Sequence, residues 1–157
     1  MFKLAKASGV RVPDLVNDVG TALALSAYTN GSLVNIDGTS GLLTLAVAAD
    51  AVAGIIVSEA GSSSYAAPAG ETYTSTLKTN DNITFLPVTG TLLIEADYTG
   101  TFAVAMTGDE FGLGDETEID LTDTTNKDFR VVGTVKNAAG VVTKLKGFFV
   151  NPGYFTS

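Results

Sequence analysis

The sequence contains no cysteine, no histidine and no tryptophan. Without cysteine the chain has no disulfides, iron–sulfur clusters, thiolate zinc sites or cysteine nucleophiles. Without histidine it has no Ser–His–Asp triad, no imidazole metal ligand and no histidine acid–base catalyst. We therefore expect a protein that is not an enzyme and that needs no cofactor.

Charge is also scarce, because charged residues make up 17% of the chain, against about 25% in ordinary soluble domains. The net charge is −8, which makes nucleic acid and anionic membranes poor partners. The mean hydropathy is +0.29, yet no apolar run reaches the roughly 18–20 residues that span a bilayer. A weakly charged, apolar chain of this kind is expected to cover part of its surface in an obligate assembly.

Residues 1–20 differ from the rest of the chain in their mixed basic and apolar character. Three of the nine basic residues precede the first acid, Asp14, and Pro13 interrupts any long helix. We expect an extended N-terminal arm over residues 1–20, followed by one domain over residues 21–157; a frayed terminus is the alternative. The candidate partner contacts on the arm are Phe2, Lys3, Lys6, Arg11 and Val12.

From residue 21 onward, short runs rich in Thr, Val and Ala alternate with turn signals. Asn30-Gly31 fits a two-residue hairpin turn, and Ala138-Ala139-Gly140 fits a three- to four-residue hairpin loop. The pattern predicts an all-β barrel or sandwich of about nine to ten short strands. The expected strands are 21–28, 32–36, 43–48, 53–58, 71–78, 82–88, 92–96, 101–107, 130–135 and 141–150.

The clearest alternation lies in residues 101–107, where Phe102, Val104 and Met106 share one face of the expected strand. The opposite face carries alanine and threonine, although exposed strands usually carry charge. Small neutral outward residues suit a face packed on a neighbouring subunit. They suit equally well a domain in which both sheet faces are buried.

Seven carboxylates and no basic residue lie in residues 109–123. Asp115, Glu116, Glu118 and Asp120 are weak candidates for a calcium site, since calcium binds six to eight oxygens. Their spacing does not fit an EF-hand, and a solvated acidic loop is the simpler interpretation. A glycosidase pair is disfavoured because few aromatic residues accompany the acids.

The C-terminal part of the chain is more basic and strongly aromatic. Lys144 and Lys146 are two residues apart and therefore share one face of a strand, either solvated or in contact with the acidic loop of a neighbour. The aromatic tail either closes the core of its own domain or docks on a second subunit. For the intersubunit contact we choose Phe148, Phe149, Tyr154 and Phe155.

The run ALALSAYTNGSLVNID, followed by GLLTLAVAADAVAGIIVSEAG and PAGE, resembles the head decoration, or cement, proteins of tailed bacteriophages. The later runs GTLLIEADYTGT and FRVVGTVKN…VVTKLKGFFVNPG look like further strands of the same kind of barrel. The resemblance extends over roughly residues 20–152. It lies in the general composition and strand pattern, without a diagnostic motif.

The resemblance implies a homotrimer on the outer capsid surface of a virion that is assembled in the host cytoplasm. Its partner would be the phage major capsid protein, whose neighbouring subunits it would clamp together. The arm would add a strand to the capsid or to a neighbouring subunit. The alternatives are another phage structural β-protein, such as a tail tube or fibre, and a surface glycan-binding adhesin module.

Overall fold

The structure is a computed structural model that describes residues 2–6, 27–29, 31–39, 43–56, 72–74, 85–88 and 90–153. These residues form twelve strands and one short 3-10 turn, with no α-helix among them, which confirms the all-β class. The elements are β1 (Phe2–Lys6), β2 (Ala27–Thr29), β3 (Leu33–Ile36), β4 (Leu43–Leu45), β5 (Val52–Ile56), β6 (Thr72–Thr74), β7 (Phe85–Pro87), β8 (Leu93–Thr99), η2 (Val104–Met106), β9 (Glu110–Asp115), β10 (Glu118–Asp120), β11 (Phe129–Lys136) and β12 (Val142–Phe149).

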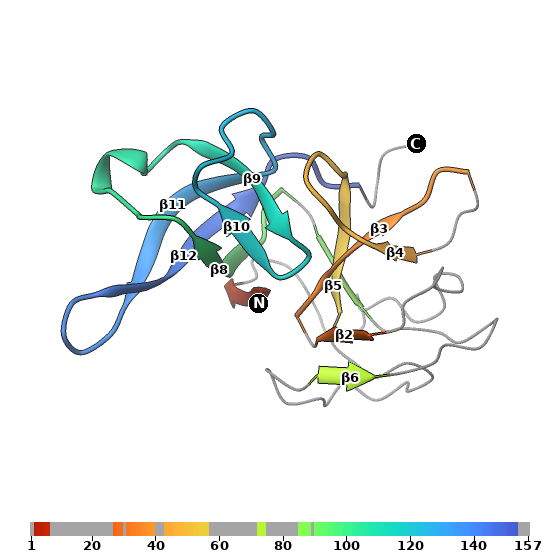
Figure 1. The fold of residues 1–157 in the computed structure, drawn as a ribbon, viewed down its shortest axis with the longest axis horizontal. Coiled ribbons are helices and arrows are strands. Elements are labelled where there is room, and N and C mark those ends of the chain that lie inside the picture. Colours follow the sequence, from red (N-terminus) through yellow and green to blue (C-terminus); the bar gives the residue numbers. More distant parts are fainter. Residues whose placement is uncertain are drawn as a thin grey trace.

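A closed five-stranded barrel forms one half of the molecule (Figure 1). Its strands follow one another in the order β8, β10, β9, β11 and β12, and β12 returns to β8. The β8–β10 pair is parallel, and the other pairs are antiparallel. Where the ring is closed, no strand has a free edge. Its main-chain N–H and C=O groups are therefore paired within the barrel, and charged edge residues are not needed to prevent pairing with another chain.

A four-stranded antiparallel sheet in the order β4, β3, β5, β7 lies beside the barrel (Figure 1). All five residues of β5 are buried, as expected for a continuous apolar run in a central strand. The barrel and this sheet are joined by main-chain hydrogen bonds, among them Leu33 N–H to Glu116 O at 2.7 Å and Gly153 N–H to Val52 O at 2.7 Å. A separate two-stranded ladder joins β2 to β6.

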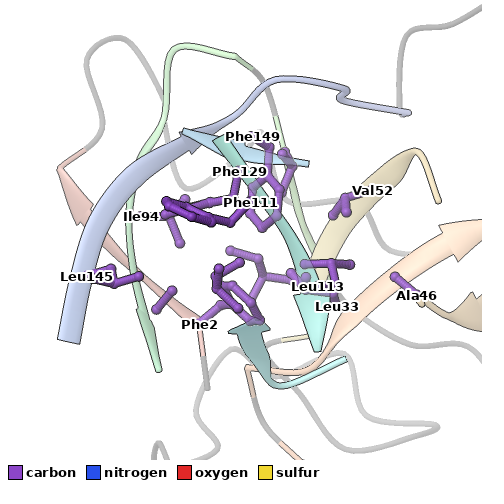
Figure 2. Close-up of a cluster of buried hydrophobic side chains, with 14 of the residues drawn as sticks. Phe2, Leu33, Ala46, Val52, Ile94, Phe111, Leu113, Phe129, Leu145 and Phe149 are labelled. Atoms are coloured by element: carbon purple, nitrogen blue, oxygen red, sulfur yellow. The ribbon is translucent and has the colours of Figure 1, made fainter. Parts of the chain in front are cut away.

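One hydrophobic cluster runs through both halves of the molecule (Figure 2). In the barrel, Phe111, Phe129 and Phe149 lie close together, and Leu33 and Val52 extend the cluster toward the four-stranded sheet. Period-two alternation explains the barrel side: Leu145 and Phe149 of β12 are buried, while Lys144 and Lys146, on either side of Leu145, are only half-buried.

The first strand corrects part of the predicted arm. Phe2–Lys6 pairs with β8 in antiparallel register, with Phe2 opposite Ala96. The Phe2 side chain is 1% exposed and lies 5.6 Å from the Phe149 ring. Phe2 is therefore a core residue of its own chain and not a capsid contact, because its apolar ring gains more from burial than from solvent exposure. Arg11 and Val12 lie outside the described residues.

The strand expected over residues 101–107 is wrong. The chain leaves β8 at Gly100, whose φ of 93° suits glycine, and then forms the 3-10 turn η2. Phe102, before the turn, and Met106, its last residue, pack against the core, while Val104 is exposed. The turn allows both Phe102 and Met106 to pack against the core without a strand. The alternating pattern alone does not distinguish this turn from a strand.

The acidic segment, expected to be a loop, contains two strands of the barrel. Phe111 and Leu113 of β9 point inward, as do Ile119 and the adjoining Leu121. Phe111 and Leu113 alternate with glycines, whereas Ile119 lies between Glu118 and Asp120, whose side chains are half-buried. The hairpin loop expected at Ala138–Gly140 is confirmed, with Gly140 at a φ of 78° after a turn closed by Gly140 N–H to Asn137 O.

Replacement of Phe2 by alanine tests the role of β1 in the core. The substitution Phe2→Ala is expected to lower the free energy of unfolding by about 3–5 kcal/mol, because it leaves a cavity beside Phe149. The measurement is urea unfolding followed by circular dichroism. Val141→Ala, at an exposed position, serves as the control and should change the stability by less than about 0.5 kcal/mol. Equal stability of the two variants would contradict the core assignment of Phe2.

Candidate functional site

The carboxylates of the acidic segment stabilise turns. The Oδ1 atom of Asp115 accepts hydrogen bonds from the N–H and the Oγ1–H of Thr117, both at 2.6 Å. Asp120 binds Thr122 in the same way, at 2.8 Å and 2.7 Å. Asp123 accepts the N–H of Thr125 at 3.0 Å. Each is an Asx turn, in which an aspartate bonds the backbone two residues later.

This use of the aspartates accounts for the repeated Asp-x-Thr spacing in the sequence, which also occurs at Asp37 and Thr39, where the N–H to Oδ1 distance is 3.0 Å. Glu116 and Glu118, the other two candidate calcium ligands, are half-buried beside the β9–β10 turn. Within the described part of the chain, no group of three or more Asp, Glu, His or Cys side chains is placed to hold a metal ion. The four candidate ligands are therefore not brought together as one site.

Asp128 is the one buried acid among the described residues, with 3% of its surface exposed. Its Oδ2 atom accepts the N–H of Leu113 in β9 and the N–H of Ala49 in the turn after β4, both at 3.2 Å. Ala49 has a φ of 70° and follows Val47 in a turn closed by Asp50 N–H to Val47 O at 3.0 Å. One carboxylate thus ties the barrel to the neighbouring sheet.

Electrostatics oppose a charge on Asp128. Burial raises the pKa of Asp128 above its ordinary value, although the hydrogen bonds from Ala49 and Leu113 act in the opposite direction. The like charges of Asp123 and Asp50 add to the rise. Asp123 itself has a lowered pKa, chiefly because the backbone and side chain of Asn126 donate hydrogen bonds to it.

Lysines and acids alternate across the outer face of β8 and β12. Lys144 pairs with Asp97, and Lys146 lies 3.8 Å from Glu95. Burial would raise the pKa of Asp97, but the hydrogen bond and charge of Lys144 are among the interactions that lower it. The prediction that Lys144 and Lys146 share one face is confirmed, and both side chains pair with acids of the same chain. On the next strand of the barrel, Arg130 pairs with Glu110.

An apolar tip, which we define as Ala103, Val104 and Ala105, projects from the barrel at η2. Val104 is 81% exposed, and both alanines are exposed. Two hydrogen bonds hold the turn, Met106 N–H to Ala103 O at 2.9 Å and Thr107 N–H to Val104 O at 3.1 Å. In Figure 1 the turn lies on the side of the barrel away from β3, β4 and β5.

Of the four residues chosen for the intersubunit contact, the structure describes Phe148 and Phe149. Phe149 is 1% exposed and packs edge-on against Phe129, with ring centroids 5.2 Å apart, so its side chain belongs to the chain's own core. The alternative that the aromatic tail closes its own domain therefore holds for Phe149. Phe148 is half-buried. Tyr154 and Phe155 lie outside the described residues, and β1 places the main chain of Lys3 and Lys6 beside β8.

Sequence reasoning missed Asp128 and the apolar tip. Asp128 stands alone among basic residues in the sequence, and only the fold brings Ala49 and Leu113 to it. Val104 belongs to an alternating pattern that predicts burial. For the tip, the available signal was Gly100 and Gly108 on either side of the expected strand, since both adopt a positive φ.

Comparisons with known proteins do not identify a family, because no family model, no curated protein and no solved structure matches the chain. No helix in the described part of the chain is both long enough and apolar enough to cross a membrane.

The Asx turns predict how the acidic segment responds to mutation and to calcium. Asp120→Ala removes two hydrogen bonds to Thr122 and should lower the free energy of unfolding by about 1 kcal/mol. Asp120→Asn keeps an acceptor oxygen and should cost less than Asp120→Ala. The thermal unfolding temperature of the wild type should be the same with and without 1 mM CaCl₂. A calcium-dependent rise that both variants abolish would show instead that Asp120 is a calcium ligand.

The raised pKa of Asp128 predicts that the free energy of unfolding decreases as the pH rises. Its pKa is raised in the folded state, so above the unfolded pKa of about 3.9 the native state binds more protons than the unfolded state. Stability contributed by Asp128 is therefore complete at low pH and falls as the pH rises through the folded pKa. Asp128→Asn removes this loss, and its stability relative to the wild type should rise with pH.

The alanine variant separates the charge of Asp128 from its hydrogen bonds. Asp128→Ala leaves the buried N–H of Leu113 without its acceptor and should be about 1–3 kcal/mol less stable than Asp128→Asn at neutral pH. Urea unfolding between pH 4 and pH 8 measures both effects. Parallel pH profiles for the wild type and Asp128→Asn would contradict the raised pKa.

Proposed function

We propose that this chain is a structural virion protein, a capsid decoration or cement protein that binds the outer face of a tailed-phage head as a homotrimer. The function is mechanical: the protein stabilises contacts between neighbouring major capsid subunits and performs no catalysis. The resemblance of residues 20–152 to such proteins and the all-β fold both agree with this role.

The observation that carries the proposal is the set of exposed valines. Val104, Val141 and Val132 are exposed on elements that hydrogen bonds hold in place, and Val141 lies at the end of the β11–β12 hairpin, which projects from the barrel (Figure 1). Each of these side chains would gain free energy if a partner covered it, and its ordered position would lower the entropic cost of that contact. The remaining exposed large hydrophobic residues are Val47 and Val150.

The charge distribution supports a protein partner over nucleic acid. Arg130, Lys144 and Lys146 each pair with an acid of the same chain. The net charge of −8 also opposes binding to the phosphate groups of nucleic acid.

Solution mass tests the assembly. The monomer has a mass of 16.1 kDa, and light scattering on a size-exclusion column should give one species of three times that mass. A stable monomer would contradict the trimer, and open-ended rings or tubes would favour a tail-tube protein.

Binding to phage heads tests the partner. Heads assembled from the major capsid protein without this chain should bind it to saturation and should then resist higher temperature than bare heads. Bovine serum albumin provides the negative control for adsorption. No saturable binding to the bare heads would contradict the proposed function.

A further inference from the structure

The apolar tip is built to stay exposed. Phe102 and Met106 pack against the core on either side of it, and the N–H of Ala103 approaches the Met106 sulfur at 3.5 Å. Behind the turn, Gly108 N–H binds Val131 O at 2.7 Å. The tip is thus fixed before any partner arrives, so little conformational entropy is lost when it binds.

The surroundings of the tip define the chemistry of its partner. No charged residue lies between Asp97 and Asp109, so the segment is neutral in a chain of net charge −8. Asp97 is paired with Lys144, whereas Asp109 is exposed at the base of the tip. The complement of this surface is an apolar recess with a basic rim.

The size of the tip limits what it can hold. A stable pair of proteins buries about 800 Å² on each partner, far more than one valine and two alanines offer. One tip by itself is therefore a weak contact, and several copies that engage together on a repeating surface would add their binding strengths. A single soluble partner or a dimer of this chain lacks that repetition, and the exposed Asp109 disfavours an anionic membrane.

We propose that Ala103, Val104 and Ala105 form the knob by which each subunit docks into an apolar recess that repeats over the phage head. This inference rests on the proposed function and names the contact through which it operates. Val104 is the central contact because its side chain is the most exposed large apolar group of the described residues.

The test compares two aspartate substitutions in the full-length protein. Val104→Asp places a charge in the recess and should weaken binding to bare heads at least about tenfold per site. Thr124→Asp adds the same charge at an exposed position of the loop between β10 and β11, outside the set of exposed valines, and should change the affinity less than twofold. Both variants should keep the circular dichroism spectrum and unfolding temperature of the wild type, since both side chains lie outside the core.

The other outcomes overturn the proposal in distinguishable ways. Wild-type affinity of Val104→Asp, or equal losses in both variants, would remove the tip from the contact while leaving the decoration function intact. Failure of the wild type itself to bind the heads would overturn the proposed function and, with it, the partner assigned to the tip. A lower solution mass of Val104→Asp would make the tip a contact between copies of this chain. Flotation of the wild type, but not of Val104→Asp, with phosphatidylcholine vesicles would make it a membrane contact.

Discussion

The contact between Phe2 and Phe149 joins the first strand of the described chain to the last. Phe149 lies 5.6 Å from Phe2 and 5.2 Å from Phe129, so three rings from β1, β12 and β11 meet in one place. Aromatic pairs in tilted and edge-on geometry add to the stability that burial provides. Because β1 and β12 both pair with β8, loss of this contact would loosen both edges of that strand.

Buried and surface aspartates also stabilise the fold, because they accept hydrogen bonds from the main chain. Asp128 fixes the turn that carries Ala49 against β9, and the Asx turns of Asp115 and Asp120 close the ends of β10. These aspartates accept hydrogen bonds from backbone N–H groups. Their number is therefore compatible with a purely structural protein. Five valines of the described residues are exposed, and the proposed assembly uses this property.

Local pattern predicted much of the fold, since alternation placed β11, β12 and most of the second sheet, and turn chemistry placed the loop at Gly140. It failed where a long-range contact decides the outcome. Phe2 looked like an arm residue because nothing nearby in the sequence reveals the space beside Phe149. Val104 looked buried because the same alternation fits a strand and a turn anchored by Phe102 and Met106. The role of Asp128 depends on two amides that are distant in sequence, so it was not predictable from spacing.

Native-state hydrogen exchange of the full-length protein tests most directly whether β1 belongs to the core. The account predicts that the amides by which β1 pairs with β8 exchange with the same free energy of opening as those of β12, because both strands share the Phe2–Phe149 contact. A β1 segment that opens at a much lower free energy than β8 and β12 would contradict this account. It would describe instead a detachable arm whose aromatic residue is available to a partner.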